Sequence, residues 1–570
     1  MILQKNLRMA AFCLPLALSL SLLCAALCPL PSGAATLDTL DKQRQQAQPQ
    51  PKAQPPLRLQ AEEMGQMAPN SKLRFTLASL RVEGATAFSE RELLAPYAAL
   101  TGTQVGFAAI NKIAVEMTKK YRDAGYLLSR VLLPAQKLEP VKANIRLVAV
   151  EGYIASVEYV GEENLVARFR SYFSGVEAKL TGQRPLRHQD FERQMLLLRD
   201  LPGITVSSRF KEGAERGASI LVLTVAAKTV SGSVGWDNSG TKSAGPYMFN
   251  ASVSLAALPL IGAKTTISYN QAFNYREYHS IELAESYQFS SGLLLQGSYA
   301  YSASPDPSTD FARQFGYSTD SNTVTVGASY PFIRSRDVNL SAGLSFVSRD
   351  TRGDALDQRL STDRLRGLTA TVTFDMADAW RGVTQVIPSF TSGLNIFGAT
   401  DEAWDASNPL APANYAKFNI YLSRNQQLFG AFSLFAAASA QLTDSPLSSY
   451  NQFQLGGAQF GRGFEPGIIK NDNGAAFTIE PRWTHALTGK TAIQPYLFYD
   501  WGRAWSEEDV AGMPDAETLA SLGIGVRLWG HVGRDNLPDF NMGFYASKGL
   551  QDIRGKSEGN RCGVQMSFLF

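Results

Sequence analysis

Seven residues decide the fold of this chain: Val230-Ser231-Gly232-Ser233-Val234-Gly235-Trp236, in which apolar residues alternate with small or polar ones. The same alternation recurs in units of about ten residues up to the C-terminus, for example in Val338–Phe346 and Val564–Phe570. Successive side chains of a strand point to opposite faces of a sheet, so each unit predicts a strand with one apolar face. In a membrane barrel that face meets lipid and the polar face lines the lumen. We therefore expect residues 228–570 to form a transmembrane β-barrel of about sixteen antiparallel strands.

The connections between the predicted strands alternate in length. Short ones such as Leu258–Gly262 and Phe332–Arg336 interleave with long polar ones such as Ser304–Ser318 and Ser445–Asn473. Barrels of the bacterial outer membrane have short periplasmic turns and long external loops. An even number of strands returns both ends of the barrel to the periplasm, so we expect the preceding segment to lie there as well.

Residues 1–35 predict a secretory signal peptide. Two basic residues precede an apolar run from Met9 to Leu30, and Ser32-Gly33-Ala34-Ala35 offers a cleavage site. Residues 36–73 are rich in Gln, Pro and Ala. Their first part, Leu37–Gln46, has the polarity of a short helix, and the remainder is typical of an extended linker. A disordered tail is the alternative for this segment.

Residues 74–154 and 155–227 predict two small soluble α+β units that share the order strand-helix-helix-strand-strand, an internal repeat. In the first unit, Ser89 and Glu92 have the spacing of a helix-capping box. Its strands and second helix are predicted at Phe75–Val82, Leu127–Leu133, Asn144–Glu151 and Ile110–Tyr121. The second unit is predicted to comprise Ser156–Val160, Leu165–Phe173, Pro185–Leu198, Thr205–Phe210 and Ser219–Val225.

The composition excludes several classes of function. A formal net charge of +3 on 570 residues argues against a nucleic-acid binder. The four histidines are scattered, so they predict no metal site. The run Gly456–Gly461 has no Lys-Ser/Thr after it, as a phosphate-binding loop requires, and the chain has no Gly-x-Ser-x-Gly elbow. We expect no enzyme, no cofactor and no metal.

Several motifs resemble those of POTRA domains, the polypeptide-transport-associated modules. In the first unit they are Leu80-x-Val82-x-Gly84, Tyr121–Tyr126, Ser129–Val131, Pro134–Gln136 and Glu151-Gly152. In the second unit they are Arg184–Leu186, Glu192-Arg193 and Leu196–Gly203, and the barrel opens with Asp237-Asn238-Ser239-Gly240. In this order, the chain resembles the outer-membrane transporters of two-partner secretion, the TpsB group that secretes haemolysins and filamentous haemagglutinin-like adhesins.

The resemblance singles out one loop motif, Gly461-Arg462-Gly463-Phe464, in the longest predicted external loop. The family places such a motif at the tip of a loop that folds back into the barrel. Its partner there is the acidic residue of a Phe-x-Asp-x-Gly strand motif, which is matched by Phe498, Asp500 and Gly502. This chain departs from the family at Gly461, where an aliphatic residue is frequent.

The chemistry of these residues supports the pairing. A guanidinium in a partly desolvated lumen needs a carboxylate, and a bidentate pair fixes orientation as well as charge. Glu480 and Arg482 are two residues apart on one strand, share a face, and can extend the pair into a network. The alternative is that Arg462 lies in a solvated loop and never meets Asp500.

The resemblance implies an exporter. Its POTRA domains would recognise a specific Sec-exported partner in the periplasm, and the partner would pass through the pore to the cell surface without ATP. The implied partners are a TpsA-type exoprotein, such as a β-helical adhesin or a cytolysin, the outer-membrane lipids, and the barrel-assembly machinery that inserts the chain. The resemblance also implies that Leu37–Gln46 is a plug helix inside the pore.

Two rival functions stay open. One is a barrel-assembly factor of the same superfamily, although such factors usually carry more POTRA domains than the two that fit here. The other is a solute channel or receptor, which has no need of paired periplasmic repeats.

Overall fold

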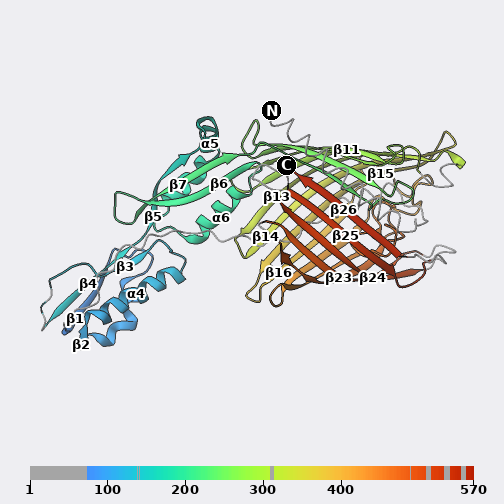
Figure 1. Ribbon diagram of the computed structural model, residues 1–570. Coiled ribbons are helices and arrows are strands. Elements are labelled where there is room, and N and C mark those ends of the chain that lie inside the picture. The colour runs from blue at the N-terminus through green and yellow to red at the C-terminus, as the bar shows by residue number, and fades with distance from the viewer. Residues whose placement is uncertain are drawn as a thin grey trace.

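The computed structural model describes residues 74–570 except 138, 140–141, 308–313, 488–489, 509–514, 532–538 and 554–559. Two small α+β units lie at one end of a closed barrel (Figure 1). The predicted signal peptide, plug helix and linker lie outside the described residues. None of the described helices is long and apolar enough to cross a membrane.

The first unit has the predicted order with a short extra strand. It comprises β1 (Arg74–Glu83), α3 (Glu90–Leu94), the 3-10 helix η1 (Ala95–Leu100), β2 (Gln104–Gly106), α4 (Phe107–Asp123), β3 (Arg130–Leu132) and β4 (Ala143–Val150). The sheet order is β2-β1-β4-β3, with β1 and β4 parallel. Ser89 and Glu92 form the expected capping box. Strand β3 is shorter than predicted because a turn precedes it, in which the Ser129 N–H donates to the Tyr126 carbonyl.

The second unit repeats this architecture. It comprises β5 (Tyr153–Val160), α5 (Glu163–Gly182), α6 (His188–Arg199), β6 (Ile204–Glu212) and β7 (Ala218–Ala227), with the sheet order β5-β7-β6. Helix α5 is twice as long as predicted because Val176 and Leu180 continue its buried apolar stripe. Helix α6 begins at His188, three residues after the predicted start at Pro185.

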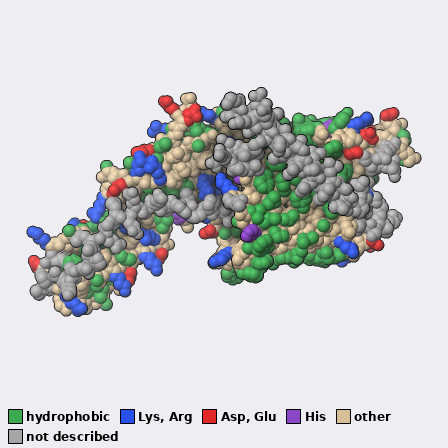
Figure 2. All heavy atoms as spheres, in the orientation of Figure 1, with side chains coloured by type: hydrophobic (Ala, Val, Ile, Leu, Met, Phe, Trp, Pro, Cys, Tyr) green, Lys and Arg blue, Asp and Glu red, His purple; other side chains and the backbone are tan. Residues whose placement is uncertain are grey.

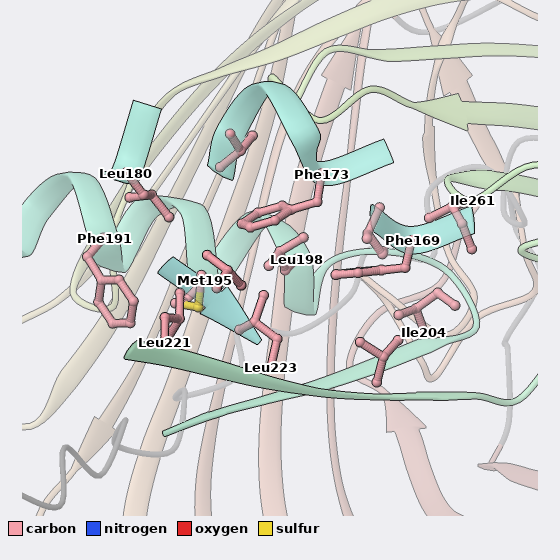
Figure 3. Close-up of a cluster of buried hydrophobic side chains, with 14 of the residues drawn as sticks. Phe169, Phe173, Leu180, Phe191, Met195, Leu198, Ile204, Leu221, Leu223 and Ile261 are labelled. Atoms are coloured by element: carbon pink, nitrogen blue, oxygen red, sulfur yellow. The ribbon is translucent and has the colours of Figure 1, made fainter. Parts of the chain in front are cut away.

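The hydrophobic core of the second unit extends into the barrel. Ala257 and Ile261 lie in the short turn between the second and third strands of the barrel. Both are buried in the same cluster as Phe169 and Leu198 (Figure 3). The second unit and this turn therefore share one core. The short turns of the barrel therefore lie on the same side as the small units, as the alternation of loop lengths predicts.

The barrel is a continuous antiparallel wall. Its strands are β8 (Val230–Asp237), β9 (Met248–Ala256), β10 (Ala263–Ala272), β11 (His279–Gln288), β12 (Leu294–Ser304), β13 (Ser318–Arg334), β14 (Val338–Ala355), β15 (Gln358–Ala377), β16 (Gly382–Gly393), β17 (Ala416–Gln427), β18 (Phe432–Thr443), β21 (Asn473–Trp483), β22 (His485–Ala486), β23 (Ala492–Trp505), β24 (Ala516–His531), β25 (Asp539–Gly549) and β26 (Asn560–Leu569). Because β21 and β22 both pair with β23 and follow one another, they count as one strand, and the described chain makes sixteen. The prediction of a sixteen-stranded barrel is confirmed.

The barrel closes where the last strand meets the first. Strand β26 pairs with β8, with Gln565 opposite Asp237. The side chain of Asn238 then continues this pairing beyond the end of β8. It donates to the Cys562 carbonyl at 2.8 Å and accepts from the Val564 N–H at 2.7 Å. The motif that opens the barrel in the sequence therefore lies at the closing seam.

The two faces of the wall differ in polarity as the alternation predicts. Val326, Leu344 and Ile524 are exposed on the outside, although each is a large apolar residue. Figure 2 shows a broad band of hydrophobic side chains across the visible outer wall. An exposed apolar band of this extent on a closed barrel is the surface that lipid covers.

Candidate functional site

The long loop between β18 and β21 folds back into the barrel. It begins with residue 444, contains the short hairpin β19 (Phe453–Leu455) and β20 (Ile469–Asn471), and ends at residue 472. At its tip, Arg462 is 4% exposed and Phe464 is fully buried, although both belong to a connecting loop. The tip therefore lies against the inner wall and not in solvent.

Arg462 and Asp500 form a bidentate ion pair. Nε of Arg462 lies 3.0 Å from Oδ2 of Asp500, and Nη2 lies 2.6 Å from Oδ1. The Arg462 N–H also donates to Oδ2, at 2.9 Å. Asp500 is 0% exposed, so the pair is shielded from water, and charge-assisted bonds of this kind are stronger than neutral ones.

Further donors complete the coordination of the Asp500 carboxylate. The Thr478 hydroxyl donates to it at 2.7 Å and the Ser521 hydroxyl at 3.2 Å, from strands on either side of β23. The Gly461 N–H donates at 3.2 Å. Ser547 of β25 binds the Arg462 carbonyl at 2.8 Å. Four adjacent strands thus hold one loop tip.

Glu480 is shared by three guanidinium groups. Arg462 Nη1 lies 2.5 Å from Oε1, and Arg482 binds Oε2 through Nε at 2.8 Å and Nη2 at 2.5 Å. Arg527 of β24 binds both oxygens through Nη2, at 3.2 and 3.0 Å. The structure therefore brings together Arg462, Asp500, Glu480 and Arg482, as the sequence led us to expect, and adds Arg527.

Each arginine of this network lies over an aromatic ring. The guanidinium carbon of Arg462 is 3.6 Å from the ring centre of Phe498, which gives the phenylalanine of the strand motif a contact of its own. Arg482 lies 4.0 Å from Phe435, and Arg527 lies 3.9 Å from Tyr496. Cation–π contacts of this geometry strengthen when they are desolvated.

The glycines of the two motifs are needed for space or for backbone conformation. Gly461 has φ +98, and a Cβ there would lie 2.7 Å from Leu519 Cδ1. A Cβ on Gly463 would lie 2.6 Å from the backbone nitrogen of Gly549, and one on Gly502 2.5 Å from Leu455 Cδ2. The departure from the family at Gly461 therefore suits a left-handed backbone, which an aliphatic residue rarely adopts.

Phe464 anchors the tip by apolar contact. It belongs to a buried cluster with Leu455, Ile469 and Leu519, which joins the loop hairpin to the barrel wall. All the predicted site residues therefore lie in one place, the inner wall between β21 and β25.

Arg527, Thr478 and Ser521 were missed from the sequence. Each lies on the lumen face of its strand, and Ser521 and Arg527 share the face of β24 that alternates with the exposed Leu522 and Ile524. A charged residue on the lumen face of a predicted strand was the available signal for Arg527. No group of three or more potential metal ligands occurs in the residues that the structure describes.

This fold and this site define a class of protein. A lipid-facing sixteen-stranded barrel, a loop locked inside its lumen and a pair of small α+β units at its periplasmic end are the architecture of an outer-membrane transporter with POTRA-type domains. Comparison with protein families identifies the particular family of transporters. Residues 217–528 match the family described as haemolysin secretion/activation protein ShlB/FhaC/HecB, and residues 75–152 match the ShlB-type POTRA domain. The chain belongs to this family of two-partner secretion transporters, and the predicted membership of the TpsB group is confirmed.

Curated relatives agree with this assignment. The chain is 26% identical over 454 residues to the outer membrane transporter CdiB of Escherichia coli, covering 76% of this chain and 74% of the relative. It is 24% identical over 423 residues to the heme/hemopexin transporter protein HuxB of Haemophilus influenzae (strain 86-028NP), covering 70% of each. It is 23% identical over 479 residues to the hemolysin transporter protein ShlB of Serratia marcescens, covering 80% of each.

Solved structures show the same fold. CdiB from Escherichia coli superposes with a TM-score of 0.69 at 21% identity, covering 93% of this chain and 96% of that one. CdiB from Acinetobacter baumannii gives 0.61 at 15% identity, covering 94% and 97%. The protein is accordingly an outer-membrane transporter whose POTRA region is periplasmic, and this location was correctly predicted.

Proposed function

We propose that the protein recognises one specific partner in the periplasm through its two small units and passes it through the barrel to the cell surface without ATP. The partner is a TpsA-type exoprotein, such as a β-helical adhesin or a cytolysin. The Arg462 loop holds the lumen in the shape that transport requires. The observation that carries the proposal is the combination of a lumen-anchored loop with a POTRA-type unit, and a second unit of similar fold, on the barrel of a secretion family.

The small units supply a means of capture. Strands β5 and β6 lie at the two edges of the second sheet, and β3 lies at an edge of the first. An extended polypeptide can add to such an edge through backbone hydrogen bonds, which need no particular sequence. Side chains beside the edge then discriminate between partners.

Energy for transport comes from the partner itself. The periplasm holds no ATP, so a released segment has to be kept from sliding back. Folding of the partner at the cell surface provides this, because it buries apolar area that an unfolded chain exposes. The plug helix proposed for Leu37–Gln46 would leave the lumen before the partner enters.

Deletion of residues 74–151, the first unit, tests the proposal against its rivals. In cells that produce the deletion variant, one large protein should vanish from the surface and the culture medium, while the variant barrel and the other outer-membrane proteins keep their abundance. A barrel-assembly factor would instead deplete other outer-membrane barrels. Unchanged secretion of every exported protein would remove the small unit from the transport mechanism.

A further inference from the structure

The charges around Glu480 do not balance while the loop tip is in place. Arg462, Arg482 and Arg527 carry three positive charges, whereas Glu480 and Asp500 carry two negative ones. The loop brings Arg462, and the barrel wall supplies the other four residues from β21, β23 and β24. The wall by itself, without the tip, therefore holds two positive and two negative charges.

Departure of the tip affects the two carboxylates differently. Asp500 would lose its bonds from Gly461 and Arg462 and keep the hydroxyl groups of Thr478 and Ser521. Glu480 would keep two guanidinium partners. A buried charge that loses its only partner is strongly destabilising. Because Glu480 keeps Arg482 and Arg527, losing Arg462 costs it less free energy.

Arg527 is suited to stay behind because its position does not depend on the loop. Its Nη1 donates to Gln494 Oε1 at 3.1 Å, and its guanidinium carbon lies 3.9 Å from the ring centre of Tyr496. Gln494 is held in turn by Thr484 at 2.8 Å. The Arg527 side chain is 30% exposed, whereas those of Arg462 and Arg482 are 4% and 3% exposed. It lies at the open end of the network.

Arg527 also repels the loop tip. Arg462 and Arg527 both bind Oε1 of Glu480, so two like charges approach the same oxygen. Repulsion between them raises the free energy of the state in which the tip is bound and is absent once the tip has left. Both effects, repulsion of the bound tip and neutralisation of the empty wall, favour release.

We propose that Arg527 is a positioning residue that sets how readily the Arg462 loop leaves the barrel wall. The inference rests on the proposed function, in which the position of this loop determines the shape of the lumen. The wall is built for two states, one with the tip bound and one with it released. Arg527 lowers the free energy of the released state, so that transport can displace the loop while Glu480 keeps two charged partners.

Trypsin cleavage between Arg462 and Gly463 measures release directly. The protease cannot enter the lumen, so cleavage there requires the tip to reach the surface, and its rate follows the released population. In the purified full-length protein in detergent, Arg527→Gln should slow the appearance of the new Gly463 N-terminus by about tenfold, because removal of the like charge favours the bound tip. Arg527→Lys keeps the charge and should restore the rate.

Controls separate this role from a merely structural one. Arg503→Gln, at an exposed position of β23 that has no ion pair among the described residues, should leave the rate unchanged. Arg527→Met places a long uncharged side chain beside Tyr496 and should behave like Arg527→Gln if charge is the cause. Equal or faster cleavage in both uncharged variants would overturn the proposal, since it would mean that Arg527 only braces the bound tip. The assay needs no partner protein, so its outcome is independent of whether the proposed secretion function holds.

Discussion

At the scale of single residues, Arg462 and Asp500 act as one unit. The guanidinium binds both oxygens of Asp500 but only one oxygen of Glu480, and Asp500 has no second charged partner among the described ion pairs. We predict that Arg462→Ala and Asp500→Ala each lower secretion of the partner sharply at normal abundance in the outer membrane, and that the double variant is no worse than either. A cycle in which both singles remove the same interaction is strongly non-additive. The measurement is the amount of partner at the surface per folded barrel, and additive losses would mean that the two residues work separately.

The sequence predicts those site residues whose charge requires an oppositely charged partner. A guanidinium placed in a lumen requires a carboxylate, and the strand motif provided Asp500. Arg527 belongs to neither motif, and its contact with Glu480 depends on which strand lies beside β23 and in which register. Register in space cannot be read from the alternation within one strand, so the third arginine became visible only in the assembled wall.

At the scale of secondary-structure elements, Glu151 connects the loop between β1 and α3 with the long helix α4 through hydrogen bonds. Its carboxylate accepts the N–H groups of Thr86 and Ala87 at 2.7 and 2.9 Å, and the hydroxyls of Thr86 and Tyr121. Partial burial raises the pKa of Glu151, but these donors outweigh burial and hold the pKa below the ordinary value of 4.5. The stabilisation is therefore complete above about pH 4.5 and is lost as the pH falls through the folded-state pKa.

Glu151→Gln should lower the urea midpoint of the first unit at pH 7, because the neutral amide binds the donors less strongly than the carboxylate does. The difference from the unaltered protein should shrink as the pH is lowered below 4.5 towards the folded-state pKa of Glu151, because the unfolded chain takes up the proton first. The midpoint is followed by pulse proteolysis of the intact protein. A difference that stays constant over this pH range would show that Glu151 stabilises the unit by shape and not by charge.

The errors at this scale have local causes. Apart from the extra strand β2 in the first unit, the order of helices and strands was correct because apolar periodicity determines it. The ends of elements depend on hydrogen bonds that periodicity does not report. The turn bond between Ser129 and Tyr126 shortens β3, and two further apolar residues lengthen α5. Barrel strands were easier to predict, since lipid outside and polar lumen inside impose a two-residue period along the whole wall.

At the scale of the whole molecule, the second unit and the barrel are one packed body. Ile261, from a barrel turn, is 4% exposed inside the core of the second unit. Arg334 of β13 binds Asp200 with both Nε and Nη2 at 2.7 Å, and Arg193 of α6 donates to the Pro331 carbonyl at 2.7 Å. A shared core and several polar contacts beside it resist separation, so movement of the periplasmic part relative to the barrel should occur mainly between the first and second units.

Ile261 tests this arrangement with a control one residue away. Ile261→Ser should lower the temperature at which the folded barrel is lost by a few degrees, because burying such a side chain contributes about 1.5–3 kcal/mol. Leu260→Ser changes a neighbour that is 58% exposed and should have no such effect. Heat-modifiability on gels, in which folded and unfolded barrel migrate differently, gives the temperature for each variant.

Deletion of residues 74–151 should leave the temperature unchanged, whereas deletion of 74–226 should lower it at least as far as Ile261→Ser does. Equal temperatures for the two deletions would mean that the second unit is hinged to the barrel, and the displacement that admits a partner could then occur at the mouth of the pore.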